Sequence, residues 1–253
     1  MICMQTSRRL LGAFVGLLAL GGTAIAGPSS LTAQWYTIAF GHPDTGQTVN
    51  GQTFGLVDAA LGPNGAPVRS AFSAGFAPGN SNNITNVDAL TNEILWWTPQ
   101  AGLVSTNAVY PNIVSIPFSA PANLFPGGIG VGSNGNPFGY LAAHLFGNFD
   151  APAGGSITLT LGADDDAWIF VNGQLVVDNG GVKALSAVPT VVSGLLAGIN
   201  SIDVFFADRH VTQSGLVFSA DVAFTPVPVP APAALGIFLA GLFGLAAARR
   251  RRG

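Results

Sequence analysis

The sequence predicts an all-β protein built around a single β-sandwich with long loops, with a helical targeting segment at each end. The middle of the chain alternates short runs of β-branched and aromatic residues with turn signals rich in Gly, Pro, Asn and Asp. It shows no long amphipathic helical pattern. Six of the nine basic residues lie at the two ends, beside apolar runs. We therefore expect three segments, 1–26, 27–225 and 226–253.

The first segment has the pattern of a secretory signal peptide. A basic pair, Arg8 and Arg9, precedes an apolar run, and Ala24-Ile25-Ala26 supplies an A-x-A cleavage site after Ala26. A retained membrane anchor is the alternative, but the glycine-rich end and the small residues favour cleavage. Cys3 is the sole cysteine of the chain, so cleavage would leave no thiol for a disulfide, a metal site or catalysis.

The last segment begins with alternating prolines and ends in four arginines, with an apolar stretch at 233–248 between them. Proline fixes φ and favours an extended, semi-rigid linker. The apolar stretch predicts a short transmembrane helix, and the arginines would remain in the cytoplasm by the positive-inside rule. A buried core helix is the alternative, which the terminal arginine cluster disfavours.

This tripartite tail resembles the PEP-CTERM sorting signal of Gram-negative bacteria, over about the last 28 residues. The resemblance implies processing by an exosortase at the proline motif, after transient anchoring in the inner membrane. Pro228 and Pro230, with Arg249 and Arg250, would then act in sorting. The sequence departs from the family because Val229 stands where the usual motif has glutamate.

The middle of the chain is strongly acidic. Between 27 and 227 it has three basic residues and all twelve acidic ones, a net charge of 3 − 12 = −9. Nucleic acid is an improbable partner, because phosphates are bound by Lys and Arg. Cations and neutral sugars are compatible with this charge.

Two strand features stand out in the middle segment. Asn172-Gly173 predicts a two-residue turn joining strands at 167–171 and 174–178. The run at 201–208 is apolar on both faces, as expected of an inner strand. The stretch 56–133 is less regular and predicts long loops, with a possible short helix at 88–97.

Three consecutive aspartates, Asp164, Asp165 and Asp166, precede the hairpin. Crowded carboxylates raise one another's pKa unless a cation lies among them, and Ca²⁺ prefers such oxygen ligands. Adjacent strand residues point to opposite faces, so shared coordination would require a bend or a cis peptide at 164–165. A solvated acidic turn is the alternative, and the EF-hand spacing is absent.

The stretches "DDDAWIFVNGQLVVDNGG" and "FFADRH", with "GHPD" and "LGPNGAPV" upstream, resemble the fibro-slime domain over about 40–225. That family is in turn similar to the protective-antigen-type β-sandwich of flocculin adhesins and some glycosidases. The resemblance implies that Asp164 and Asp165, joined by a cis peptide, bind calcium, which in turn binds sugar hydroxyls. Asp166 falls where those families often have Gly or Ser, so its role is left open.

Several other residues are candidates for the site. Asp208 could be a further calcium ligand, whereas Arg209 beside it is expected to pair with a nearby Asp. Asp178 could bind a ligand, although an Asx turn with the following glycines is favoured. Of the tryptophans, Trp96 and Trp97 are the candidates for stacking on a sugar, because one of two neighbours often faces outward.

These observations favour an exported, non-enzymatic protein of the cell surface or extracellular matrix of a Gram-negative bacterium. The leading hypothesis is calcium-assisted binding of carbohydrate or exopolysaccharide. The rival is a structural matrix or biofilm protein in which calcium only stabilises a loop. A carbohydrate-active enzyme or its accessory is the third and least favoured hypothesis. A glycosidase needs two carboxyl groups about 5–10 Å apart, and adjacent aspartates are too close together for that.

Overall fold

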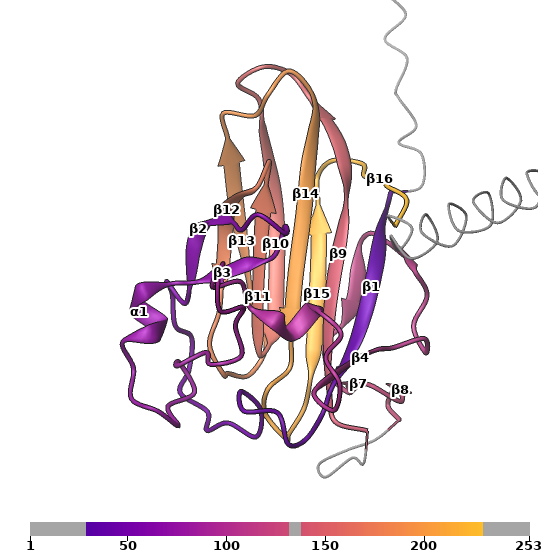
Figure 1. The fold of residues 1–253 in the computed structure, drawn as a ribbon. Helices are drawn as coiled ribbons and strands as arrows, with labels where there is room; N and C mark the ends of the chain where they lie inside the picture. The colour runs from indigo at the N-terminus through magenta and orange to yellow at the C-terminus, as the bar shows by residue number, and fades with distance from the viewer. Residues whose placement is uncertain (1–28, 132–137, 230–253) are drawn as a thin grey trace, which may run out of the picture.

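The computed structural model describes residues 29–131 and 138–229, whose regular secondary structure is almost all β-strand (Figure 1). The first half holds short elements after one long strand: β1 (Ser30–Ile38), β2 (Val57–Leu61), β3 (Pro67–Arg69), α1 (Ala71–Ala74), the 3-10 helix η1 (Leu95–Trp97), β4 (Val104–Thr106), β5 (Ile113–Ser115), β6 (Phe118–Ala120), β7 (Leu124–Phe125) and β8 (Gly128–Ile129). The second half holds most of the long strands: β9 (Tyr140–Ala151), β10 (Ser156–Asp164), β11 (Asp166–Val171), β12 (Gln174–Asn179), β13 (Ser186–Ser193), β14 (Gly198–Ala207), β15 (Gly215–Ala220) and β16 (Thr225–Pro226).

Two antiparallel sheets pack face to face, as predicted for a β-sandwich. The larger has ten strands in the order β3-β2-β12-β11-β14-β9-β1-β4, with β16 paired to β9 and β5 to β1. The smaller has four strands in the order β13-β10-β15-β6. One buried apolar cluster includes residues of both sheets, such as Leu159 and Phe218 of the smaller sheet and Val204 of the larger. The predicted fold class is therefore confirmed.

Strand β14 shows why the run at 201–208 is apolar on both faces. Ile202, Val204 and Phe206 face the second sheet in the main core, whereas Phe205 and Ala207 belong to a separate buried cluster on the outer face. Side chains alternate between faces along a strand, so both sets can be buried only if both faces are covered.

The outer face of the ten-stranded sheet is covered in part by the irregular segment between β2 and β4. Trp96 and Trp97 of η1 are buried there against Trp168 and Phe205 of the sheet. The possible helix at 88–97 is largely wrong, since only Leu95–Trp97 is helical and Asp88 to Thr91 form a turn. The Asp88 carboxylate accepts hydrogen bonds from the backbone N–H groups of Leu90 and Thr91, which favours that turn over a helix.

The β11–β12 hairpin forms as predicted, with positive φ at both Asn172 (51°) and Gly173 (74°). The proposed signal peptide, Ala26 included, lies outside the described residues. The predicted C-terminal helix and Pro230, Arg249 and Arg250 lie outside them as well. Among residues 29–131 and 138–229, no helix is long and apolar enough to cross a membrane.

Candidate functional site

The three consecutive aspartates lie where the chain passes from one sheet to the other. Asp164 ends β10 of the smaller sheet, opposite Gly215, and Asp166 begins β11 of the larger sheet, opposite Ala207. The peptide between Asp164 and Asp165 is cis, one of the geometries that shared coordination was expected to require. Asp208 follows β14 directly, so it reaches the same end of the sandwich. We call Asp164, Asp165, Asp166 and Asp208 the acidic cluster.

Asp165 is held by backbone groups from two other loops. Its Oδ1 accepts a hydrogen bond from the Lys183 N–H (2.9 Å), and its Oδ2 accepts from the N–H groups of Arg209 (2.7 Å) and His210 (2.8 Å). These bonds fix the carboxylate, and each oxygen has more than one lone pair to offer. Burial, followed by the charge of Asp166, raises the pKa of Asp165.

Asp166 is the structural member of the acidic cluster. Its Oδ2 accepts from Arg209 Nε (2.7 Å), and its Oδ1 accepts from the Gly181 N–H (2.5 Å). The Arg209 guanidinium also donates to the Ser81 carbonyl (2.6 Å) and lies 4.9 Å from the Trp96 ring. The expected pairing of Arg209 with an aspartate is thus confirmed. Arg209 thus balances the charge of Asp166, and metal coordination by Asp166 stays a prediction.

Asp164 and Asp208 are the members with spare oxygen capacity. Within the described part of the chain, no N–H group donates to the Asp164 carboxylate, and Asp208 accepts one N–H bond, from His210 (3.2 Å) to Oδ1. Both carboxyl groups lie within hydrogen-bonding reach of Asp165. Burial and the charge of Asp165 raise the pKa of Asp164 to about 7 and raise that of Asp208 well above its ordinary value.

Lys183 was not singled out from the sequence, but it is the second buried cation of the site. Its Nζ donates to the carbonyl oxygens of Ala163 (2.9 Å) and Asp165. Burial lowers its pKa, while the three consecutive aspartates act in the opposite direction. Its signal in the sequence was its rarity as one of three cations in an acidic segment. With Lys183 and Arg209 charged, four ionised carboxylates leave a net charge of 2 − 4 = −2.

Asp178 has a structural role rather than the ligand-binding one considered for it. Its Oδ1 accepts from Trp168 Nε1 (2.9 Å) and from the Gly180 N–H (3.2 Å), which forms the favoured Asx turn. Its Oδ2 accepts from the Gly55 N–H (2.6 Å). These bonds tie β12 to the loop before β2.

The stacking prediction for Trp96 and Trp97 is wrong, because neither ring faces outward. Their exposed fractions are 0% and 6%. Trp96 Nε1 donates to Asp44 Oδ2 (2.9 Å), and Trp97 Nε1 donates to the Phe206 carbonyl (3.0 Å). Both rings pack on Trp168 and line the buried cluster of the outer face. The prediction assumed a strand, in which neighbouring side chains point to opposite faces and one of them is exposed. Trp96 and Trp97 instead lie on a one-turn helix, where both are buried.

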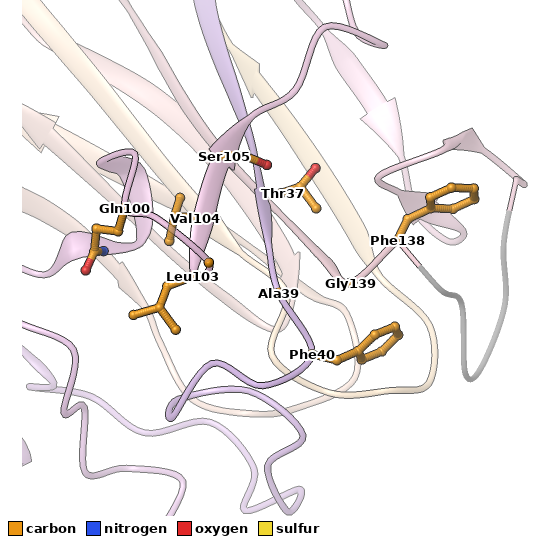
Figure 2. A pocket seen from close by; sticks show the side chains of 10 residues that line it. Thr37, Ala39, Phe40, Gln100, Leu103, Val104, Ser105, Phe138 and Gly139 are labelled. Carbon is orange, nitrogen blue, oxygen red and sulfur yellow. The ribbon is translucent and has the colours of Figure 1, made fainter.

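A separate pocket of about 280 Å³ lies beside the end of β1 and the start of β4. Figure 2 shows Phe40 and Phe138 on one side of it and Gln100 and Leu103 on the other. None of its ten lining residues is acidic, basic or histidine, so it offers no general acid or base.

One family of domains matches the part of the sequence that holds the acidic cluster. Residues 98–213 match the PA14 domain. This match includes the whole acidic cluster and the β11–β12 hairpin. This match agrees with the protective-antigen-type resemblance of the sequence.

The curated proteins that resemble this chain do so over short stretches of its sequence. Protein psiQ of Dictyostelium discoideum is 37% identical over 71 residues, which is 27% of this chain and 7% of psiQ. Protein psiE of the same organism is 36% identical over 64 residues, 24% of this chain and 13% of psiE. This chain thus covers a small part of the relatives' length. A solved "PA14 sugar-binding domain from RTX adhesin" is 17% identical, with 79% of this chain and 94% of that chain covered and a TM-score of 0.36.

Proposed function

We propose that this chain is an exported, non-enzymatic binding protein whose PA14 domain holds carbohydrate at the acidic cluster with the help of calcium. The observation that carries the proposal is the pairing of two buried carboxylates, Asp164 and Asp165, beside Asp208 at one end of the sandwich. When all four carboxyl groups of the acidic cluster are ionised, their charge exceeds that of Lys183 and Arg209 by two. The raised pKa values of Asp164 and Asp208 mean that this ionisation is unfavourable without a bound cation. Burying unbalanced charge is costly unless a counter-charge is supplied.

The residues fit calcium better than other metals. All the available ligands are hard carboxylate oxygens, and neither cysteine nor histidine belongs to the acidic cluster. Asp164 and Asp165 would hold the ion, with Asp208 adjoining. Among the described residues, no three His, Cys, Asp or Glu side chains are grouped so as to hold a metal by themselves. Calcium takes six to eight oxygens, so carbonyl, water or ligand oxygens would complete the set.

A neutral polysaccharide is the partner that fits this site. When bound, calcium supplies a positive centre that accepts lone pairs from neighbouring sugar hydroxyls. The chain contributes the fixed Asp165 carboxylate and the Asp164 oxygens, which can also accept hydrogen bonds from those hydroxyls. The net charge of −9 in the middle of the chain disfavours anionic ligands.

A glycan array probed with and without EDTA tests the proposal. We expect wild-type protein to bind in calcium and to lose at least about tenfold of its signal in EDTA. The double variant Asp164→Asn/Asp165→Asn should lose the calcium-dependent signal, because neutral amides supply no negative charge to balance that of the calcium ion. The matched control is Asp58→Asn/Asp150→Asn, which removes the same charge at two exposed positions.

Two results of that experiment would oppose the proposal. If all glycan binding persists in EDTA, calcium has no part in it. If the array shows no glycan binding while calcium raises the Tm of the wild-type protein in a thermal melt, the rival role as a structural matrix or biofilm protein is favoured instead.

Export and sorting complete the proposed function. We assign the chain to the fibro-slime type, with residues 1–26 as a cleaved signal and 226–253 as a PEP-CTERM-type tail for an exosortase. The protein would then be held briefly in the inner membrane and end at the cell surface or in the matrix of a Gram-negative bacterium.

A further inference from the structure

A second cleft, of about 490 Å³, lies on the outer face of the ten-stranded sheet. Its floor is made by side chains of β1, β9 and β14, and its wall by the loop between β2 and β3 and by the segment around Glu93. It is distinct from the acidic cluster. Asp166 pairs with Ala207, whereas Asp203 lies four residues farther along β14, about 13 Å at the usual rise per residue. The rings of Trp97 and Phe205, with centroids 4.9 Å apart, pack at the inner side of the cleft.

Strand register brings the floor residues together. Gln34 is directly opposite His144, and Phe146 is directly opposite Asp203. Directly opposed side chains on one face of an antiparallel pair have Cβ atoms about 5 Å apart. Gln34, His144 and Phe146 therefore form one patch on the floor of the cleft, and Asp203 lies beside it.

The Gln34 amide is oriented by its neighbour Tyr36. The Tyr36 hydroxyl donates to Gln34 Oε1 (3.2 Å). Burial raises the pKa of Tyr36 to about 12, so the hydroxyl keeps its proton at neutral pH. Because the amide oxygen faces Tyr36, the Gln34 –NH₂ group points elsewhere, and it donates to no other group among the described residues. The Gln34 –NH₂ group can therefore donate to a ligand at the half-buried floor of the cleft.

The imidazole of His144 is fixed between rings. It stacks on Phe205 at 4.2 Å with an interplanar angle of 7°, and on Phe146 at 4.8 Å and 30°. Its Nε2 lies 2.9 Å from Asp203 Oδ1, and both side chains are about one-fifth exposed. Oδ2 of Asp203 has no donor among the described residues, so it remains an acceptor close to the Phe146 ring.

The wall of the cleft is built as firmly as the floor. Glu93 is 2% exposed, and its carboxylate accepts from the N–H groups of Asn64 (2.7 Å) and Ala66 (3.3 Å) and from the Thr91 hydroxyl (2.8 Å). Gly62 leaves room for this arrangement, because a Cβ there would lie 2.4 Å from Glu93 Cγ. The loop is thus held in place over the sheet.

We propose that this cleft is a second, calcium-independent site for a neutral saccharide ring. Binding pockets of this size are typically apolar, with a few polar groups that fix the ligand's orientation. Here the Gln34 –NH₂ on the floor supplies a donor, and Phe146 supplies an apolar surface for a ring face. The Asp203 carboxylate does not line the cleft itself but adjoins it through its contact with His144, and there it supplies an acceptor for a hydroxyl. Asp88 and Glu93 also line the cleft, so anionic ligands are disfavoured. The site is independent of the acidic cluster and of its metal.

The test is a panel of uncharged gluco-, manno- and galacto-oligosaccharides applied to the full chain in EDTA. We expect at least one of them to bind, and Gln34→Ala and Asp203→Asn each to weaken it about tenfold or more. Gln174→Ala is the matched control, because Gln174 is exposed on β12 and should leave binding unchanged. The His144 ring signals, followed by NMR, should shift with the bound sugar.

Two results would overturn this second site. One is that no uncharged oligosaccharide binds in EDTA. The other is that EDTA-resistant binding survives in both variants with His144 signals unmoved. The Asp164→Asn/Asp165→Asn variant should retain the EDTA-resistant binding, so failure of the calcium site and failure of this cleft are distinguishable.

Discussion

At the scale of single residues, the aspartates of one short run have different environments. Asp166 is neutralised by Arg209, Asp165 is held by three backbone N–H groups, and Asp164 accepts from no N–H group among the described residues. The sequence could predict the crowding of charge, because the residues are adjacent. It could not predict which member is neutralised, because Arg209 is 43 residues from Asp166.

The unusual pKa of Asp164 predicts how the stability of the metal-free protein depends on pH. A carboxyl whose folded pKa is raised contributes stability that is present below its unfolded value of 3.8 and lost as pH rises through about 7. In EDTA, Asp164→Asn should therefore gain thermal stability relative to wild type between about pH 4 and pH 7. The measurement is the difference in Tm between the two proteins across that range.

Asp150→Asn is the control for this pH series, since its carboxyl is exposed on β9. Its Tm difference from wild type should stay nearly constant. An Asp164→Asn difference that is flat, or that falls with rising pH, would contradict the buried, crowded environment described for Asp164.

At the scale of elements, local signals were the most informative. Turn chemistry predicts the Asn172-Gly173 turn, which is confirmed. Side-chain alternation predicts that 201–208 is apolar on both faces, as an inner strand is, and this is also confirmed. The crossing between sheets at Asp164–Asp166 depends on pairing with Gly215 and Ala207, which no local pattern reveals. The predicted exposure of Trp96 or Trp97 failed for the same reason. The irregular segment that buries them has no repeating pattern of apolar residues in the sequence.

The β11–β12 turn predicts a specific cost for losing a glycine. Gly173 has φ +74°, and a Cβ there would have nothing within 4 Å. Gly173→Ala should therefore destabilise the protein by about 1–2 kcal/mol through backbone conformation alone. The matched control is Gly41→Ala, where space is equally open but φ lies outside the left-handed region. Urea unfolding measures both, and equal free energies of unfolding for the two variants would contradict the turn geometry.

At the scale of the whole molecule, the two ends of the described domain lie together. The Ser30 N–H donates to the Phe224 carbonyl (3.3 Å), and β16 pairs with Gly147 and Asn148 of β9. The loop after β14 instead contacts the start of β9, where the Asp208 N–H donates to the Leu141 carbonyl (2.9 Å). Six residues of strand separate Leu141 from Gly147, roughly 20 Å. A tail leaving from β16 would thus hold the acidic cluster away from its point of attachment.

The sequence predicted this architecture more completely than it predicted the sites. Alternation and turn signals suffice for a sandwich, and the PA14 match over 98–213 agrees with them. The outer-face cleft was not predicted, because Gln34, His144 and Asp203 come from three strands that only the register brings together.

Calcium binding at the acidic cluster is tested most directly by calorimetric titration of calcium into the EDTA-stripped chain. We expect one ion bound per wild-type chain, no measurable binding by Asp164→Asn/Asp165→Asn, and wild-type binding by Asp58→Asn/Asp150→Asn. Calcium at about 100 times its dissociation constant should then stabilise the wild-type fold by about 2.7 kcal/mol. If the wild-type chain takes up no calcium, or the Asp164→Asn/Asp165→Asn variant binds it as well as wild type, the acidic cluster is not a calcium site.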